Sequence, residues 1–597
     1  MLTLRRLLPS LQRFRCHPIP TTQRSSCFAT MARNYAVRLS FLSSNASSRT
    51  SAPAQTTFDA IDKLNSLQTN ASILEALRKA GPRMNDRSLP EMCEHVRRIG
   101  YEPSDFDVLN IIHITGTKGK GSTCAFAESI LLHYHEETGA SPIRTGLFTS
   151  PHLVAVRERI RINGRSISEE MFARYFFECW DKLEETKEQY LAEKLKREKG
   201  PKQHIIDQRN HIDKPTYFRF LTLLAFHVFM QEKVDAAIIE VGVGGEFDST
   251  NIVERPVVTG VTSLGLDHVS VLGTTLDKIA WHKAGIFKKD APAVAFEQPP
   301  EAMEVIVQRA QEKDSPLTII YTKDAEELKD VPLGVYPLIV SLNSTSHQIS
   351  KQSSCSILIS SPSASALPPG LAGVHQRYNA AVAISLCRTW LARYRPSHAP
   401  TDDLVPLGFG TGLRTVSWPG RGQTLPNSLT KYAGSGVNLT WYLDGAHTIE
   451  SLHVCAEWFR DTVAQKKDGM ERILIFNCTN GRDGAKMLKV LAAVQKEVEF
   501  DEAVFCTNVT FRAGYKSDNQ NNTYELDPAL AQQHSLADEW RALAPGARTR
   551  VVGSVEDAVL YAVERAEHSG EKGMQVLTTG SLILVGNQLA VMGVEPV

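Results

Sequence analysis

A glycine-rich run with lysine and hydroxyl side chains follows the first strongly apolar stretch of the chain. The run Gly116–Thr123 comes directly after Ile111–Thr115, and a helical pattern extends from Thr123 to about Tyr134. A strand, a glycine turn and a helix form a geometry that binds phosphate, because glycines let backbone N–H groups converge on the anion and the helix N-terminus adds positive potential. Lys120 would supply a full positive charge to such a site.

The spacing of this run differs from that of the common P-loop. Ile114 stands five residues before Gly119, where that motif has its first glycine. The alternative is a glycine-rich turn between strand and helix that binds no ligand. A turn without a ligand would not explain why Lys118 and Lys120 stand among the glycines, where they have no packing role. The run therefore favours a phosphate site.

A carboxylate lies at the end of a second apolar strand. Glu240 lies near the end of the apolar run Ala236–Val241, and a glycine-rich turn follows this run. Ligands of a parallel sheet bind outside the carboxyl ends of its strands, so Glu240 is expected to reach a metal beside the phosphates. Mg²⁺ prefers carboxylate, hydroxyl and phosphate oxygens. A structural glutamate that caps the glycine turn is the alternative.

Two further polar side chains follow expected strands of the same sheet. His268 comes after Val257–Thr262 and repeats the position of Glu240, although a histidine satisfied within its own loop fits the pattern equally well. Ser150 follows Thr145–Phe148 and could supply a hydroxyl, although Ser-Pro by itself indicates only a turn. The sequence leaves both metal-ligand assignments open.

A second group of polar residues follows an expected strand much later in the chain. Asp444 and His447 come directly after Leu439–Leu443, and they would face a cleft if two domains close on each other. Lys283 lies within a helical pattern, where a lysine is ordinarily solvated, and nothing in its local sequence distinguishes it.

Strand and helix patterns alternate in two series, which predicts an α/β fold. The first series predicts a parallel sheet with helices on both faces, and the second a smaller, Rossmann-like domain. The family resemblance given below implies that the first is a P-loop ATPase domain. The expected divisions are an extension (1–58), the ATP-binding domain (59–410, with insertions at about 182–210 and 341–370) and a C-terminal domain (411–597). The expected strands of the C-terminal domain are Leu439–Leu443, Arg472–Phe476, Ala503–Thr507, Arg550–Val552 and Gln575–Thr578.

Composition excludes several classes of protein. A chain of 597 residues is too long for one ordinary core. The formal net charge of zero gives no basic excess for nucleic acid, and ten cysteines without a C-x-x-C pair indicate reduced thiols. The longest apolar segment, Phe218–Met230, is too short to span a bilayer. We therefore expect a soluble monomer without nucleic-acid partners or an integral membrane segment.

The first 58 residues differ from the rest. They contain no Asp or Glu, whereas eight arginines are spread among serine, threonine and leucine. This composition is typical of a mitochondrial presequence, and Leu2–Phe14 can form a basic amphipathic helix. A tail without a targeting role is the alternative. Met31 is a second candidate start, so we expect a mitochondrial pool (matrix or inner-membrane-associated) and a cytoplasmic pool.

Seven motifs in a fixed order make Asp59–Val597 similar to the folylpolyglutamate synthase family of the Mur ligase superfamily. The motifs are Ile114–Ser122, Phe148–Leu153 with Arg157–Gly164, Ile239–Gly245 with Asp248, Gly265–His268, Ile279–Phe287, Trp418–Arg421 and Asp444–His447. Any one of them alone would be a weak signal. The resemblance implies ATP and Mg²⁺ at two sites as cofactors, with a monovalent cation as a further candidate.

The resemblance also implies roles for residues at matching positions. The implied phosphate-binding residues are Gly119, Lys120, Gly121 and Ser122, and the implied magnesium ligands are Ser150, Glu240 and His268. The implied nucleotide contacts elsewhere are Asn379, Arg421 and Asp444. Lys283 falls where related ligases carry a carbamylated lysine, and His447 would orient groups around glutamate or phosphate. Lys120, His447 and Lys283 are thus the catalytic candidates.

The reaction implied by the resemblance is ATP-dependent ligation of L-glutamate, in γ-linkage, to tetrahydrofolate and its polyglutamates. An acyl phosphate would be the intermediate, and the product would retain folate for one-carbon metabolism. One alternative is a dihydrofolate synthase, which would add the first glutamate to dihydropteroate; Arg157–Gly164 leans towards the polyglutamylating enzymes. The other is a catalytically silent nucleotide-binding module.

Overall fold

The computed structural model of the chain describes residues 56–68, 87–197, 213–323, 371, 373–400, 405, 407–435, 437–464, 469–478, 482–514, 527–569 and 573–594. Three expected features lie wholly or partly outside these residues: the presequence, the insertion at 341–370, and residues 198–210 of the charged insertion. Within the described part, no helix combines the length and apolar character that a membrane crossing requires.

The first sheet has eight strands in the order β4-β3-β2-β5-β1-β6-β7-β8. They are β1 (Ile112–Thr115), β2 (Thr145–Phe148), β3 (Ile160–Ile162), β4 (Arg165–Ser166), β5 (Ala236–Glu240), β6 (Val258–Val261), β7 (Ala293–Phe296) and β8 (Leu317–Ile320). Strands β2, β5, β1, β6, β7 and β8 pair in parallel, whereas β3 and β4 add an antiparallel edge beside β2. The carboxyl ends of β1, β2, β5 and β6 therefore meet at one edge of the sheet.

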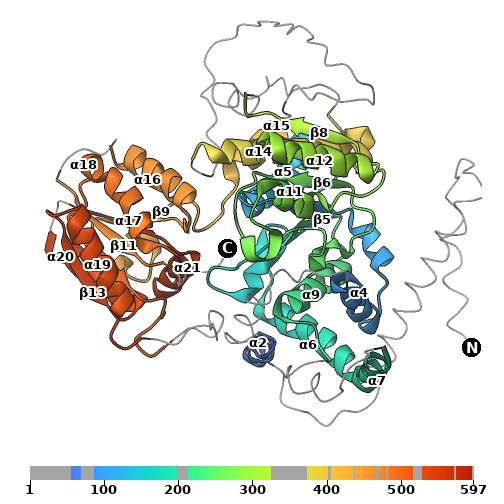
Figure 1. Cartoon of the computed structure of the whole chain (residues 1–597), viewed down its shortest axis with the longest axis horizontal. Helices are drawn as coiled ribbons and strands as arrows, with labels where there is room; N and C mark the ends of the chain where they lie inside the picture. Colours follow the sequence, from blue (N-terminus) through green and yellow to red (C-terminus); the bar gives the residue numbers. More distant parts are fainter. Residues whose placement is uncertain are drawn as a thin grey trace, which may run out of the picture. The chain divides into compact units, whose positions relative to one another are not determined.

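Alternate residues of the central strands face two different layers of helices. Ile238 belongs to the core formed with α5, α14 and α15, whereas Ile239 belongs to the core formed with α4, α6 and α9. Figure 1 shows α4, α6 and α9 grouped together beside β5. These helices are α4 (Ser88–Arg98), α5 (Lys120–Thr138), α6 (Glu169–Glu185), α9 (Tyr217–Glu232), α14 (His375–Tyr394) and α15 (Leu407–Thr415). Burial on both faces explains why these strands are apolar throughout.

The second sheet has six strands in the order β13-β12-β11-β14-β10-β9. They are β9 (Gln423–Pro426), β10 (Leu439–Leu443), β11 (Glu471–Phe476), β12 (Glu502–Cys506), β13 (Arg548–Val552) and β14 (Met574–Thr579). One face packs on α16 (Ile449–Ala464), α17 (Gly484–Ala493) and α19 (Ala531–Leu543), and the other on α20 (Val555–Ser569) and α21 (Leu582–Val591). The colours of Figure 1 show that a separate stretch of chain builds each sheet. The predicted α/β class with two largely parallel sheets is confirmed.

Several predicted element boundaries were wrong. The apolar pattern of Val108–Thr115 predicts a single strand, but the strand begins at Ile112, because Pro103–Leu109 forms a 3-10 helix and Asn110 takes a left-handed conformation with φ +47°. Helix α5 begins at Lys120 rather than Thr123, so the glycine turn passes into the helix three residues earlier than expected. Helix α15 contains the expected domain border at residue 410 and packs against α5.

A buried histidine in β1 gives the fold a specific sensitivity to acid. His113 is fully buried, forms a hydrogen bond of 2.9 Å between its Nε2 and the Thr250 hydroxyl, and leaves Nδ1 without a partner. Burial lowers the pKa of His113 to about 3. The unfolded chain takes up this proton below about pH 6.5, whereas the folded chain resists it, so stability is lost as the pH falls from about 6.5 to 3.

We therefore expect the free energy of unfolding to fall by up to about 1.4 kcal/mol per pH unit from this one group. Urea denaturation of His113→Gln and the parent chain between pH 7 and 5 measures the effect. The variant should show a shallower dependence on pH, and replacement of the exposed His534 by glutamine should leave the slope unchanged. Equal slopes for the parent and His113→Gln would contradict the assignment.

Candidate active site

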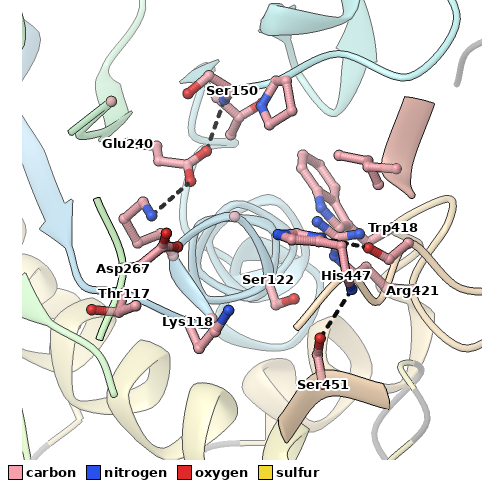
Figure 2. A pocket seen from close by; sticks show the side chains of 18 of the residues that line it. Thr117, Lys118, Ser122, Ser150, Glu240, Asp267, Trp418, Arg421, His447 and Ser451 are labelled. Atoms are coloured by element: carbon pink, nitrogen blue, oxygen red, sulfur yellow. Dashed lines mark hydrogen bonds and ion pairs between the residues drawn. The ribbon is translucent and has the colours of Figure 1, made fainter. Parts of the chain in front are cut away.

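A cavity of about 1000 Å³ opens at the carboxyl edge of the first sheet. Segments that follow strands of both sheets line the cavity. They are the glycine run after β1, the segments after β2, β5 and β6, and the segment after β10. Figure 2 shows Lys118, Ser122 and Glu240 in this cavity together with Arg421 and His447. The structure therefore gathers into one place polar residues that are more than 300 positions apart in the chain.

The glycine run leaves the first turn of α5 facing the cavity. Gly119 precedes the helix with φ +83°, and Lys120, Gly121 and Ser122 form its first turn. The first N–H groups of a helix have no acceptor within it, so they are available to an anion. The N–H groups of Thr117 and Lys118 instead donate to the Ser263 carbonyl, at 3.0 Å each. The N–H groups that remain available to an anion are thus those at Gly119–Ser122 rather than those of the whole run.

Gly119 is in tight contact with a residue from α14. A Cβ atom at Gly119 would lie 2.0 Å from Oδ1 of Asn379, whose amide nitrogen donates to Gln376 at 2.9 Å. The predicted nucleotide contact Asn379 therefore lies directly beside the phosphate loop, and it also lines the cavity. No residue with a side chain fits at position 119 without a shift of Asn379.

We expect Gly119→Ala to abolish nucleotide binding, because the methyl group meets Asn379 and a positive φ disfavours alanine. The dissociation constant for ATP should rise more than about tenfold, which corresponds to 1.4 kcal/mol. Calorimetric titration with ATP measures this change. Gly553→Ala is the matched control, because a Cβ atom there meets nothing within 4 Å. ATP affinity within twofold of the parent chain in Gly119→Ala would refute this reading of the loop.

Glu240 connects the phosphate loop to the segment after β2. Its Oε2 accepts the Ser150 N–H at 2.8 Å (Figure 2), and its Oε1 lies 4.0 Å from Nζ of Lys120. Burial raises the pKa of Glu240, and the nearby Lys120 ammonium partly opposes this rise. Glu240 therefore lies next to two other predicted site residues, Lys120 and Ser150.

Asp267 and His268 approach the same cavity from the segment after β6. His268 has φ +51°, and its N–H donates to Oδ1 of Asp267 at 2.9 Å. Both residues line the cavity, and Figure 2 shows Asp267 beside Lys118 and Thr117. The predicted ligand His268 thus lies at the expected strand end, and the carboxylate next to it adds a hard oxygen donor.

The second sheet contributes a carboxylate, a guanidinium and an imidazole. Asp444 accepts the Gly422 N–H at 2.7 Å and the Ala446 N–H at 2.8 Å. Burial raises the pKa of Asp444, and the charge of Arg421 opposes this rise. Burial lowers the pKa of His447 to about 4, and its Nδ1 hydrogen-bonds to the Gly445 carbonyl at 2.7 Å. His447 is therefore a neutral imidazole near pH 7.

Lys283 does not line this cavity. It is buried, and its ammonium donates to the Gly116 carbonyl at 2.7 Å, behind the phosphate loop. Burial lowers the pKa of Lys283 well below that of a solvated lysine, with the charge of Lys120 as a smaller cause. The local sequence suggests an ordinary solvated helix lysine, and this expectation is wrong. Lys283 lies in α11 (Leu276–Ala284), which packs the side of the helix that carries this lysine against the loop.

Sequence reasoning missed several contacts within the cavity. Lys118 donates to the Thr448 hydroxyl at 3.3 Å, and Ser451 accepts the His447 N–H at 3.1 Å. The Arg161 guanidinium lies over the Trp418 ring, 4.6 Å from its centroid. The Lys118–Thr448 and Arg161–Trp418 contacts join segments that are far apart in the chain, so no local pattern indicates them, whereas Ser451 lies only four residues after His447.

The donor set of the cavity fits a hard divalent cation that is completed by phosphate oxygens. Among the described residues, no three His, Cys, Asp or Glu side chains converge on one point. The available donors are the Glu240 carboxylate, the Ser122 and Ser150 hydroxyls, and His268. Mg²⁺ is usually bound through one or two carboxylates together with substrate phosphates and water, which this set can provide.

Known proteins resemble the chain along most of its length. No family model matches it. It is 41% identical over 548 residues to a folylpolyglutamate synthase of Neurospora crassa, an alignment that covers 90% of this chain and 92% of the relative. It is 40% identical over 542 residues to the folylpolyglutamate synthase of Saccharomyces cerevisiae (strain FostersO), with 89% and 86% covered.

Solved structures agree on the fold. A Mycobacterium tuberculosis folylpolyglutamate synthase complexed with ADP matches with a TM-score of 0.60 at 23% identity, over 90% of this chain and 100% of that one. E. coli FolC in complex with DHPP and ADP matches with a TM-score of 0.56 at 21% identity, over 91% and 99%. The fold agrees with these structures, and the identity to the fungal relatives is well above what a shared fold alone requires. The chain belongs to the folylpolyglutamate synthase family.

Proposed function

We propose that the chain is an ATP-dependent ligase that adds L-glutamate in γ-linkage to tetrahydrofolate and its polyglutamates. The observation that carries this proposal is the 41% identity to a protein named folylpolyglutamate synthase over nine tenths of the chain. The cavity supports it, because a phosphate loop and buried carboxylates from both sheets face one space. We further propose that the chain acts as a monomer.

Ligation requires activation of the folate carboxylate, because a carboxylate oxygen is a poor leaving group. The γ-carboxylate of the folate attacks the γ-phosphorus of ATP, and ADP leaves with the bond electrons. The amine of glutamate then attacks the acyl phosphate carbonyl carbon, loses a proton and expels inorganic phosphate. Each turnover therefore consumes one ATP and forms one amide bond, with ADP and phosphate as products.

The residues of the cavity would serve these steps mainly through electrostatics and position. Lys120 and the first-turn N–H groups of α5 would offset the charge on the transferring phosphoryl group. Arg421 and Asp444 would hold the nucleotide from the second sheet. Neutral His447 would orient glutamate or phosphate through its imidazole, since its lowered pKa keeps it uncharged. Lys283 would support the loop from behind through Gly116.

Glu240, Ser150 and His268 are the proposed protein ligands for Mg²⁺, with Ser122 as a further hydroxyl donor. The bound ion would supply Lewis-acid polarisation of phosphate oxygens. Removal of divalent cations with a chelator should therefore abolish turnover, and added Mg²⁺ should restore it.

Hydrolysis of ATP tests the class of the protein. The full chain should release ADP and phosphate only when a reduced folate and L-glutamate are both present. ATP binding without such coupled turnover would instead indicate a silent nucleotide-binding module.

We also propose that residues 1–58 direct part of the protein to mitochondria. The acid-free, arginine-rich composition supports this proposal. A fluorescent reporter fused to residues 1–58 should enter mitochondria, and the same fusion begun at Met31 should remain cytoplasmic because it lacks Arg5, Arg6, Arg13, Arg15 and Arg24. Diffuse fluorescence from both fusions would contradict the proposal.

A further inference from the structure

The segment that follows β2 spans the distance between the nucleotide site and the second sheet. At its start, the Ser150 N–H donates to Glu240 inside the cavity. Four residues later, Val154 is 4% exposed and belongs to the apolar core of the second sheet, with Leu443, Leu584 and Val585. A five-residue stretch thus touches the machinery of the first sheet and the interior packing of the second.

One carboxylate fixes the backbone of this segment. Glu158, in the 3-10 helix η3 (Val156–Arg159), accepts the N–H of Leu153 at 2.9 Å on Oε2. Its Oε1 accepts the N–H groups of Val154 and Ala155 at 2.8 and 2.7 Å. Three charge-assisted hydrogen bonds to consecutive amides leave the segment little freedom, and the carboxylate itself is buried. The side chain also lines the cavity.

The segment rests on α21 at a glycine. A Cβ atom at Gly586 would lie 2.0 Å from the carbonyl oxygen of Leu153 and 2.7 Å from its carbonyl carbon. Because both atoms belong to the backbone, no side-chain rotation could relieve this clash. The Leu153 side chain meanwhile lies within 3.3 Å of the Cβ position of Gly420, which belongs to the linker motif at Trp418–Arg421. Gly586 therefore allows a contact between backbones that any other residue would prevent.

We propose that Glu158 and Gly586 are positioning residues for ligation. Glu158 holds Leu153–Ala155 in one conformation, and Gly586 lets that conformation dock on α21. Docking fixes the segment at its far end, which keeps the Ser150 N–H on Glu240. This inference rests on the proposed ligase function, although the docking itself can be measured without turnover.

The test uses the full chain and four variants. Gly586→Ala removes the docking site, and Gly546→Ala is its control, because a Cβ atom at Gly546 meets nothing within 4 Å. Glu158→Ala removes all three acceptors, whereas Glu158→Gln keeps one carbonyl oxygen for two of the three N–H groups. Hydrogen exchange of a peptide covering residues 149–160 reports the segment. Glutamate incorporation gives kcat and the KM values for ATP and for tetrahydrofolate monoglutamate.

Gly586→Ala should accelerate exchange in peptide 149–160, more than 400 residues away in sequence, and Gly546→Ala should not. Because misplacement by about 1 Å can cost about 100-fold, kcat should fall between about tenfold and 100-fold. The KM for ATP should stay within about threefold, because the first turn of α5 is untouched. A general loss of stability would not lower kcat while it leaves the KM for ATP nearly unchanged. Glu158→Gln should retain more activity than Glu158→Ala.

Parent-like exchange and kcat in Gly586→Ala would overturn the inference. If Gly586→Ala instead exchanges faster throughout the second sheet, the two Glu158 variants decide the question. A kcat that falls more in Glu158→Ala than in Glu158→Gln supports the inference, and a parent-like kcat in Glu158→Ala overturns it. If the parent chain incorporates no glutamate, the proposed function fails, and the difference in exchange between Gly586→Ala and Gly546→Ala still decides whether the segment docks.

Discussion

Replacement of Lys120 by alanine should lower kcat for glutamate ligation by about 10²–10³-fold, the typical cost of removing a charge-stabilising group from a transition state. Its ammonium lies at the first turn of α5, 4.0 Å from Glu240, with 17% of the side chain exposed. An ammonium in this position meets negative charge on the transferring phosphoryl group with little competition from water. The loss should therefore fall mainly on kcat rather than on folate affinity.

Steady-state glutamate incorporation at saturating ATP measures the Lys120→Ala effect. Lys289→Ala is the control, because that lysine is 73% exposed. Near-normal turnover of Lys120→Ala, with the control also normal, would remove Lys120 from the mechanism.

Glu240→Gln should lower turnover by about 10²-fold and raise the Mg²⁺ concentration needed for half-maximal activity. Glutamine keeps an oxygen for the Ser150 N–H but removes the negative charge beside Lys120. The change therefore tests the charge of Glu240 while it preserves most of the local packing. Magnesium titrations of Glu240→Gln and of Glu304→Gln, an exposed residue of α12 (Pro300–Glu312), measure the difference. Identical titrations would contradict the role of Glu240 as a metal ligand.

The pH dependence provides a second check on Glu240. Burial raises its pKa, and the carboxylate is the form that would bind Mg²⁺. Activity should therefore fall as the pH is lowered towards that raised pKa, and added Mg²⁺ should shift the decline to lower pH because the ion competes with the proton.

Local sequence patterns predicted the elements that carry the site, because each is a short buried strand followed by a turn. The expected strands Thr145–Phe148 and Leu439–Leu443 agree with β2 and β10 residue for residue. The edge strand β9 was missed, since Gln423–Pro426 is short, buries only Leu425 and ends in a proline. Its pairing is antiparallel to β10, so the alternating pattern of strand and helix does not contain it.

The family resemblance identified candidate site residues that local sequence patterns could not identify. Nothing local distinguishes Lys283, and only packing of α11 behind the phosphate loop explains why this lysine is buried on Gly116. Contacts between distant segments could not be predicted from the sequence for a different reason. Lys118 and Thr448 are 330 positions apart, and so no periodicity relates them. The docking of Leu153 on Gly586 likewise depends on how the folded elements meet.

The most direct test of the ligase function is ATP-dependent incorporation of glutamate by the full chain, followed by mass spectrometry of the folate product. Tetrahydrofolate monoglutamate and dihydropteroate are compared as acceptors. The account predicts serial addition of glutamate to tetrahydrofolate. Product on dihydropteroate alone would contradict it and would identify a dihydrofolate synthase on the same fold.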